Sequence, residues 1–434
     1  MSGEPLHFTL SSAAGPLDRE LRLGLAGLGA EEKVLLKASV TDDRLVEWVS
    51  WAYFQADAEG RVDLASQAPL DGSYQGVEPM GLLRYMTPAQ GLAAPDRFRH
   101  RHWDVPVATR LEAAAAPGGP ATLAEIPRPL LEPGSRVKPV RRGRLVGTLF
   151  LPPGRGPWPG VLDLGGWEGG LAQEPFAALL CSHGLAVLAV AWWGLPGLPA
   201  APAQVALEYF AEAVEFLRTH REVRGTDLAI VGTDRGAEAA LMVGAAYGRF
   251  RAAAVWNPSA VLWSGPGDHA GQWGGPLLTY QGRPLPHLEA DLTHYLPQHQ
   301  QGPIITRCLF NRPLDDPARA EAAAIPVEKL GCPLLVCSGQ EDQVWPSERF
   351  AALIRQRLVH HGLAATLTQR SYEGAGHLMG SLCLPNTPAS VHQTPDPQTG
   401  LQRDLGGEAA ASAAAATDSF LEATAFLQRN LLQK

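Results

Sequence analysis

Residues 228–236 read Leu228-Ala229-Ile230-Val231-Gly232-Thr233-Asp234-Arg235-Gly236. A short apolar strand runs into a Gly-x-x-x-Gly turn, and an alanine-rich helix is predicted to follow over residues 235–247. This pattern predicts a nucleophile elbow, a sharp strand-to-helix turn that presents its middle residue at the end of a sheet. The glycines are needed because the strand and helix backbones approach too closely for a Cβ atom. The presented residue is Asp234, at a position where acyl-transferring enzymes carry serine or cysteine.

From about Gly143 the sequence alternates between apolar strands and amphipathic helices, which is typical of a mostly parallel sheet covered on both faces. Strands are predicted at residues 144–151, 159–164, 185–191, 228–232, 252–256, 333–338 and 365–370. Helices are predicted at residues 175–182, 205–219, 235–247, 347–361 and 417–432, and the alanine-rich run 409–416 is expected to be a flexible lead into the last helix. Together with the elbow, this alternation indicates an α/β-hydrolase domain over residues 144–434.

The preceding residues, 1–135, are predicted to form an N-terminal β-sandwich domain. Strand-like runs separated by turn signals occur at residues 7–11, 20–25, 33–40, 45–54, 108–113 and 122–126. Residues 127–139 are rich in proline and basic side chains and are predicted to link the two domains. Residues 258–330 show little periodicity, and we expect so long an irregular segment to line or cap a pocket. At 434 residues, two domains are the natural expectation.

Composition excludes several classes of function. The formal net charge of −8 argues against a surface for nucleic acid or anionic membranes, and no apolar run is long enough to span a bilayer. The five cysteines have no CxxC spacing, so we expect reduced thiols, no metal site and no cofactor. The first residues lack signal-peptide character and the last four lack a Ser-Lys-Leu-type signal, so a cytoplasmic protein is expected and a peroxisomal one less so. A monomer or small homo-oligomer is expected.

Three acids and bases occur in the chain order that an α/β-hydrolase requires, nucleophile position, acid and histidine. Asp234 stands at the elbow, Asp342 follows the predicted strand at 333–338, and His377 follows the next strand in Glu373-Gly374-Ala375-Gly376-His377. Loops at the carboxyl ends of parallel strands are where open α/β sheets place their sites. The sequence therefore predicts Asp234, Asp342 and His377 as catalytic residues.

The donors of an oxyanion hole are expected from two backbone segments. One is the N–H of Arg235, directly after the elbow residue. The other is the glycine-rich loop at residues 163–170, where Gly166 and Trp167 are the candidate donors because a glycine-rich backbone can approach a substrate oxygen closely.

Each of these residues also has an ordinary structural interpretation. Asp234 is a good helix N-cap, Asp342 suits a turn or a cap beside the competing acid Glu341, and His377 is one of thirteen histidines. The tryptophans near these loops are interpreted either as lining of an acyl pocket or as plain core; they are Trp167, Trp192, Trp193 and Trp345.

Taken with the N-terminal half, the sequence resembles the acyl-CoA thioesterase and bile acid-CoA:amino acid N-acyltransferase family over nearly its whole length. The most specific stretch is Val62-Asp63-Leu64 followed by Gly72-Ser73-Tyr74-Gln75-Gly76-Val77-Glu78-Pro79-Met80-Gly81-Leu82-Leu83. Residues 146–153, 207–210, 339–345 and 376–377 are similar to the family's hydrolase-domain entry, crossover helix, acid loop and histidine loop. The resemblance implies a CoA-thioester substrate that is cut at the interface between the two domains.

The sequence departs from the family pattern at the elbow. An aspartate that attacks a thioester forms a mixed anhydride, and the carboxylate (pKa about 4) leaves far more readily than the thiolate (about 8.5). Three functions stay open: a CoA-thioester hydrolase in which Asp234, or His377 with Asp342, activates water; an aspartate-nucleophile hydrolase that acts at a saturated carbon; and a non-catalytic acyl-CoA-binding protein. Amino-acid conjugation is the least expected activity, because it relies on an elbow cysteine.

Overall fold

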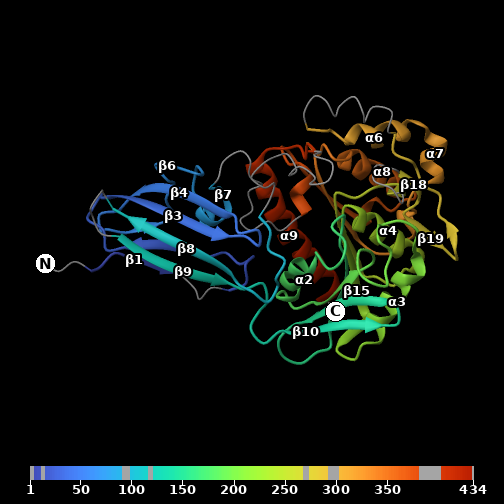
Figure 1. The fold of residues 1–434 in the computed structure, drawn as a ribbon, viewed down its shortest axis with the longest axis horizontal. Helices are drawn as coiled ribbons and strands as arrows, with labels where there is room; N and C mark the ends of the chain where they lie inside the picture. Colours follow the sequence, from blue (N-terminus) through green and yellow to red (C-terminus); the bar gives the residue numbers. More distant parts are fainter. Residues whose placement is uncertain are drawn as a thin grey trace. The chain divides into compact units, whose positions relative to one another are not determined.

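The structure is a computed structural model that describes residues 4–10, 15–89, 98–115, 121–266, 273–291, 303–380 and 402–432. The chain separates into two compact units, of which the first reaches Glu132 and the second begins at Pro133 (Figure 1). Among the described residues, every helix falls short of the length and apolarity that crossing a membrane requires.

The first unit is built from two antiparallel sheets, as the sequence predicts for a β-sandwich domain. The larger sheet has the order β6-β4-β3-β8-β9, with β7 paired to β4, and the smaller has the order β1-β2-β5. The strands are β1 (His7–Leu10), β2 (Leu23–Ala26), β3 (Lys33–Thr41), β4 (Glu47–Gln55), β5 (Val62–Asp63), β6 (Asp71–Gly72), β7 (Thr87–Pro88), β8 (Val107–Ala114) and β9 (Ala121–Arg128). One short helix, α1 (Gly81–Arg84), precedes β7. The predicted strand at 7–11 ends on Ser11, which lies outside the described residues.

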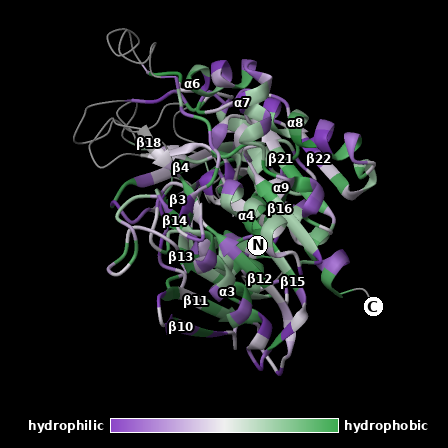
Figure 2. Ribbon diagram, turned by 90° about the vertical axis from the view of Figure 1, so that its right-hand side faces the viewer, coloured by the Kyte–Doolittle hydropathy of each residue, from purple (hydrophilic) through white to green (hydrophobic). Residues whose placement is uncertain are grey.

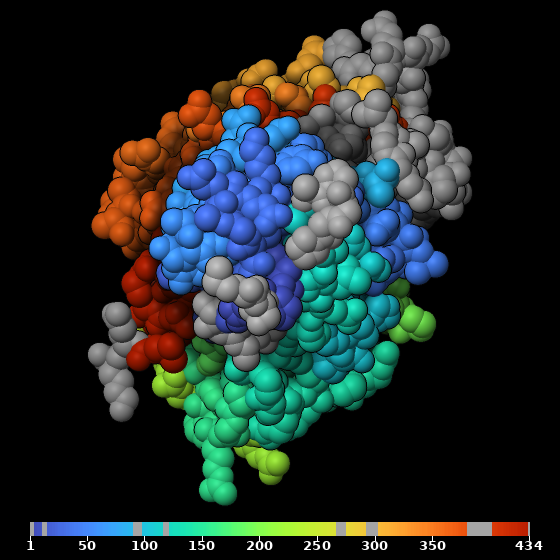
Figure 3. Space-filling view, turned by 90° about the vertical axis from the view of Figure 1, so that its left-hand side faces the viewer, coloured from blue at the N-terminus to red at the C-terminus, as the bar shows by residue number. Residues whose placement is uncertain are grey.

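Alternation of side chains gives this unit one buried face. In β3 and β4 every second residue is buried, and Trp48 and Phe54 of β4 lie in the core. The outward-facing Trp51 and Tyr53 of the same strand remain 38% and 41% exposed and contact each other edge to face. Figure 3 shows the surface of this unit in blue to teal.

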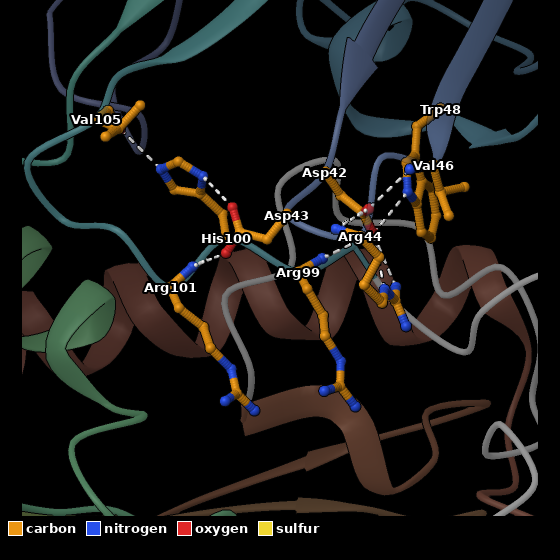
Figure 4. A network of polar contacts seen from close by, with 9 residues as sticks. All are labelled: Asp42, Asp43, Arg44, Val46, Trp48, Arg99, His100, Arg101 and Val105. Atoms are coloured by element: carbon orange, nitrogen blue, oxygen red, sulfur yellow. Dashed lines mark hydrogen bonds and ion pairs between the residues drawn. The ribbon is translucent and has the colours of Figure 1, made fainter. Parts of the chain in front are cut away.

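A buried carboxylate organises the turn between β3 and β4 (Figure 4). Asp42 accepts hydrogen bonds from the backbone N–H groups of Arg44 and Val46, from the Arg44 guanidinium and from the indole of Trp48. Burial alone would raise the pKa of Asp42, but these bonds and the Arg44 charge hold it below its usual range. Asp43 beside it accepts from the Arg101 backbone at 2.7 Å, so the two aspartates fasten the segment that precedes β8.

The second unit contains an eight-stranded sheet in the order β10-β11-β13-β12-β15-β16-β21-β22. Its first two pairings, β10 with β11 and β11 with β13, are antiparallel and all the others are parallel. The strands are β10 (Arg136–Arg142), β11 (Leu145–Leu151), β12 (Trp158–Leu164), β13 (Ala186–Ala191), β15 (Val223–Thr233), β16 (Ala252–Trp256), β21 (Leu334–Gly339) and β22 (Leu367–Tyr372). This arrangement confirms the predicted α/β-hydrolase fold.

Helices cover both faces of this sheet. The main helices are α2 (Glu174–Cys181), α3 (Leu207–Thr219), α4 (Arg235–Tyr247), α8 (Ser347–His360) and α9 (Ala409–Leu432). Residues of α3, α4 and α8 share one apolar cluster with the sheet, whereas Phe176 of α2 and Phe420 of α9 contact each other, with ring centroids 5.5 Å apart. The central strands are buried on both sides and are coloured mainly as hydrophobic in Figure 2.

Two sequence-based predictions of local structure were wrong, and a third was right only in part. The predicted linker at 127–139 does contain the boundary between the two units, after Glu132, but it contributes Pro127 and Arg128 to β9 and its last residues to β10, an edge strand that tolerates Pro139. The run 409–416 is the first part of α9 rather than a flexible lead, because alanine is the strongest helix former and Ala413, Ala415 and Ala416 are buried. Residues Val205–Ala206, predicted to begin a helix, form strand β14.

The irregular stretch 258–330 carries short elements that the sequence did not reveal, and part of it lies outside the described residues. These elements are β17 (Ser264–Pro266), β18 (Trp273–Pro276), β19 (Leu278–Tyr280), β20 (Arg283–Pro284), α6 (Arg307–Asn311), the 3-10 turns η3 (Arg312–Asp315) and η4 (Val327–Lys329), and α7 (Pro317–Ala322). Its residues 260–263 are buried in the core of the unit. Arg307 and Asn311 line a cavity of about 140 Å³ that also reaches Asp342.

Candidate active site

The elbow is a strained turn between β15 and α4. Asp234 has φ 51° and ψ −119°, a left-handed backbone conformation that L-residues rarely adopt. A Cβ atom on Gly236 would lie 2.0 Å from the carbonyl oxygen of Leu164, and one on Gly232 would lie 2.4 Å from the carbonyl oxygen of Gly236. Both glycines are therefore required by close backbone approach, as the pattern predicts for a nucleophile elbow.

The carboxylate of Asp234 does not act as a helix cap. Asp234 occupies the N-cap position of α4, but its side chain makes no capping hydrogen bond. The turn is held by backbone bonds instead: the Asp234 N–H donates to the carbonyl of Trp256 at 3.0 Å, and the Asp234 carbonyl accepts from Ala237 at 3.0 Å. The alternative interpretation of Asp234 as an ordinary cap is therefore wrong.

Asp342 lies in the loop after β21 and is almost completely buried, with 1% exposure. Its Oδ1 accepts backbone N–H bonds from Val344 at 2.8 Å and Trp345 at 3.2 Å, so it does shape the turn. Its Oδ2 lies 2.9 Å from Nδ1 of His377. The competing acid, Glu341, is exposed. Asp342 therefore does both things at once: its Oδ1 shapes the turn and its Oδ2 contacts the histidine.

His377 begins the 3-10 turn η6 (His377–Gly380), and its side chain is 14% exposed. Burial alone would lower the pKa of His377, but the charge and hydrogen bond of Asp342, together with the charge of Asp234, raise it above its usual range. Burial raises the pKa of Asp234, against the lowering effects of His377 and of Arg235. The structure thus places the elbow carboxylate within electrostatic reach of the imidazole that Asp342 holds.

The glycine-rich loop at 163–170 packs against the elbow. A Cβ atom on Gly166 would lie 3.0 Å from the carbonyl oxygen of Thr233 and 3.3 Å from Cβ of Asp234. The loop is fastened from the next strand by the indole of Trp192, which donates to the carbonyl of Gly165 at 3.1 Å. The Arg235 backbone N–H, the other expected oxyanion donor, is hydrogen-bonded to the Asp234 carboxylate and lowers its pKa. Both predicted donor segments therefore border residue 234.

A buried ion pair beneath the elbow is a feature that sequence reasoning missed. The Arg235 guanidinium is 2.7 Å from Oε2 of Glu238 and donates to the carbonyl of Ser264 at 2.9 Å. It lies 5.8 Å from the ring centroid of Trp167 and 5.7 Å from that of Trp345, within the range of cation–π attraction. The Arg-x-x-Glu spacing on a predicted helix was the available signal. The Arg235 side chain thus connects α4 to three other segments: the loops that carry Trp167 and Trp345, and the segment after β16 that carries Ser264.

The core interpretation is confirmed for two of the four tryptophans, and the acyl-pocket interpretation stays a prediction for the other two. Trp192 and Trp345 are each 2% exposed and belong to the core. Trp167 and Trp193 are only partly buried, and the Trp193 ring packs against Gly169 of the glycine-rich loop at 163–170. Within the described residues, no three His, Cys, Asp or Glu side chains are grouped as metal ligands.

Comparison with known proteins identifies the family. A family model described as "BAAT / Acyl-CoA thioester hydrolase C terminal" matches residues 205–433, and "Acyl-CoA thioester hydrolase/BAAT N-terminal region" matches residues 18–142. The chain belongs to the BAAT/acyl-CoA thioester hydrolase family. The signature stretch that carried the resemblance lies in the N-terminal region of this family, where Gly81 packs so closely against Tyr74 that a Cβ atom would lie 2.3 Å from its ring.

Relatives in this family match nearly the whole chain. "Acyl-coenzyme A thioesterase 2, mitochondrial" of Mus musculus is 33% identical over 96% of this chain and 87% of its own length. "Acyl-coenzyme A thioesterase 1" of Homo sapiens is 33% identical over 95% and 94%, and "Peroxisomal succinyl-coenzyme A thioesterase" of Mus musculus is 32% identical over 95% and 94%. Because these family members are named for different compartments, the cytoplasmic location stays a prediction, as does the monomeric or small homo-oligomeric state.

Proposed function

We propose that this protein hydrolyses acyl-CoA thioesters to a free acid and CoA, with His377 as the general base that activates water. The observation that carries the proposal is the 2.9 Å contact between Nδ1 of His377 and the buried carboxylate of Asp342. A histidine whose Nδ1–H is held by a carboxylate has its Nε2 lone pair available to accept a proton. The relatives named as acyl-CoA thioesterases supply the substrate class.

The chemistry proceeds through a tetrahedral intermediate. Nε2 of His377 takes a proton from water as the water oxygen bonds to the thioester carbon, and the carbonyl oxygen becomes an oxyanion. We assign the stabilisation of that charge to the backbone N–H groups of Arg235 and of the Gly166–Trp167 loop, because both segments border residue 234. The C–S bond then breaks, and the imidazolium returns its proton to the CoA thiolate. Asp342 stays ionised throughout and stabilises the imidazolium.

Asp234 has a supporting role in this scheme and forms no acyl intermediate. After attack by a carboxylate, the tetrahedral intermediate would expel the carboxylate in preference to the thiolate. The gap of about 4–5 pKa units between the two leaving groups corresponds to roughly 6 kcal/mol against the forward direction. A carboxylate next to the imidazole instead accepts a hydrogen bond from the attacking water and orients its lone pair.

The test is a CoA-release assay with short-, medium- and long-chain acyl-CoA substrates. We expect measurable thiol release by the wild-type protein and a loss of about 10²–10⁴-fold in kcat for His377→Gln. Asp342→Asn is expected to reduce kcat with little change in KM, because it disturbs the base and leaves substrate contacts intact. Absence of turnover across the panel, together with tight acyl-CoA binding by calorimetry, would instead identify a binding protein.

A second candidate function is hydrolysis at a saturated carbon through an aspartyl ester. The observation that favours it is the Asp234 carboxylate itself, which stands at the strained elbow position without a capping role. Such a reaction would leave one solvent oxygen in the Asp234 side chain, because water attacks the ester carbonyl. Single turnover of a reactive alkyl halide or epoxide in H₂¹⁸O, followed by mass spectrometry of the elbow peptide, detects that label, and an unlabelled peptide after turnover excludes the route.

A further inference from the structure

The carboxylate that holds the histidine has a second side-chain donor on the same oxygen. Ser347, the first residue of α8, is fully buried, and its hydroxyl donates a hydrogen bond to Oδ2 of Asp342. That is the oxygen that faces Nδ1 of His377. The imidazole and the hydroxyl therefore share one carboxylate oxygen.

The other oxygen of Asp342 is already engaged by the backbone of its own loop. With Oδ1 accepting from Val344 and Trp345, and Oδ2 from Ser347 and His377, the carboxylate plane is held from four directions. Ser347 makes no capping bond for α8, whose N-cap residue is Pro346. Because the hydroxyl serves the carboxylate rather than the helix, its removal leaves the helix start intact.

The charged groups that face this pair come from several elements. Asp234 of the elbow and Arg403, which precedes α9, act on His377 with opposite sign. The cavity of about 140 Å³ that is lined by Asp342 and Ser347 is also bordered by Arg307, Glu348 and Arg349. Among the described residues, the side-chain partners of Oδ2 are the Ser347 hydroxyl and the His377 imidazole, and none of these other groups takes the place of the hydroxyl.

We propose that Ser347 is a positioning residue for the acid–histidine pair: its hydroxyl fixes the orientation of the Asp342 carboxylate and limits the share of its negative charge that the imidazole receives. The inference deepens the proposed hydrolase function, and its effect on the pH profile of kcat/KM rests on that function. Its effect on the titration of His377 can be measured without any turnover.

Removal of the hydroxyl has a defined direction. In Ser347→Ala, the negative charge on Oδ2 is stabilised by His377 without a competitor, so the imidazolium form is favoured and His377 titrates at higher pH. A general base must be deprotonated, so the acidic limb of kcat/KM moves to higher pH by the same amount. We expect both the His377 titration and the acidic limb to shift upward by about 0.5–1 pH unit. This is smaller than the shift that a newly added charged neighbour causes, because only a hydrogen bond is removed.

The experiment is an NMR titration of the His377 ring in the full-length protein, with the signal assigned by its disappearance in His377→Gln. The matched control is Ser338→Ala. Ser338 is equally buried and also donates to a carboxylate, but its acceptor is Oε2 of Glu348, at 2.7 Å, rather than Asp342. We expect the upward shift in Ser347→Ala and none in Ser338→Ala. An unchanged His377 titration in Ser347→Ala, or an equal shift in both variants, would overturn the proposal.

Two further variants separate positioning from packing. Ser347→Thr retains the hydroxyl and is expected to restore the wild-type titration, whereas Ser347→Cys keeps the volume with a weak donor and is expected to shift it. If Ser347→Ala does not fold, this pair carries the test. If the His377 titration shifts in Ser347→Ala but the wild-type protein releases no CoA, the positioning role is supported and the hydrolase function is rejected. If the wild-type protein releases CoA but the titration does not shift, the hydrolase function is supported and the positioning role is rejected.

Discussion

The Asn257 side chain holds His377 by its backbone. Nδ2 of Asn257 donates a hydrogen bond of 2.5 Å to the carbonyl of His377, while the His377 N–H donates to the carbonyl of Leu405 at 2.9 Å. Asn257 follows β16, is 3% exposed and has φ 44°, a left-handed conformation that asparagine tolerates better than most residues. The end of β16 thus supports both the elbow, through Trp256, and the histidine loop.

Loss of the Asn257 amide is expected to lower the rate of CoA release while the protein remains folded. In Asn257→Gly the left-handed backbone stays relaxed and only the hydrogen bond to His377 is lost. Because the His377 carbonyl then remains buried without this donor, the free energy of unfolding is expected to fall by about 1–3 kcal/mol. Asn257→Ala adds backbone strain and is expected to be less stable than Asn257→Gly by about 1 kcal/mol. Urea unfolding and CoA release on both variants measure the two effects. Equal activity in Asn257→Gly and wild type would show that the clamp is dispensable.

The coupling between Asp234 and His377 predicts a pH dependence. The negative charge of Asp234 raises the pKa of His377, so Asp234→Asn is expected to lower it. The neutral imidazole then persists to lower pH, and the acidic limb of kcat/KM moves in the same direction. The measurement is the pH profile of CoA release together with the NMR titration of His377. Asp227→Asn, whose carboxylate pairs with Arg251 and takes no part in the site, is the control and is expected to leave the profile in place.

Much of this site was predictable because its residues follow buried strands at glycine-rich turns. Asp234 and Asp342 each follow a strand whose apolar run is plain in the sequence, His377 follows the more polar strand β22, and parallel strands bring their carboxyl ends to one edge. The closeness of Gly236 to the carbonyl of Leu164 also follows from the elbow pattern. Sequence alone left open whether Asp234 caps α4, because a cap and an elbow residue occupy the same position and differ only in backbone angle and side-chain direction.

The features that escaped prediction depend on contacts between distant segments. Nothing near Ser347 in the sequence shows that its hydroxyl meets Asp342 rather than the helix it begins. The Arg235 guanidinium is buried only because Trp167, Trp345 and the Ser264 carbonyl, from three separate loops, close around it. The predicted linker extended into strand β10 because an edge strand with one partner tolerates proline and basic residues.

Because the Arg235–Glu238 pair is buried, removing one of its charges is expected to lower the free energy of unfolding more than removing both. Arg235→Met leaves the Glu238 carboxylate buried without its cation, and the expected loss is about 3–5 kcal/mol in the free energy of unfolding. Arg235→Met combined with Glu238→Leu removes both charges and is expected to be the more stable of the two variants. Chemical denaturation compares them. A double variant less stable than Arg235→Met would show that the hydrogen bond of Glu238 with Trp263 outweighs the cost of burying the unpaired carboxylate.

Serine at the elbow is expected to convert a slow hydrolase into a faster one. In Asp234→Ser, a hydroxyl replaces the carboxylate next to His377, and attack by its oxygen forms an acyl-enzyme by expelling CoA thiolate, a better leaving group than an alkoxide. The like-charge repulsion between the elbow carboxylate and the developing oxyanion disappears as well, and the Arg235 N–H is released toward the substrate. We expect at least about a tenfold rise in kcat, the effect of 1.4 kcal/mol.

Asp234→Ala separates these two contributions, because it removes the carboxylate without supplying a nucleophile. We expect Asp234→Ser to exceed Asp234→Ala in kcat and to accumulate an acyl-enzyme that mass spectrometry detects on the elbow peptide after a short reaction. The rise should vanish in Asp234→Ser combined with His377→Gln, because the hydroxyl then has no base. Equal rates for Asp234→Ser and Asp234→Ala, without a covalent adduct, would mean that residue 234 acts on this reaction only through its charge.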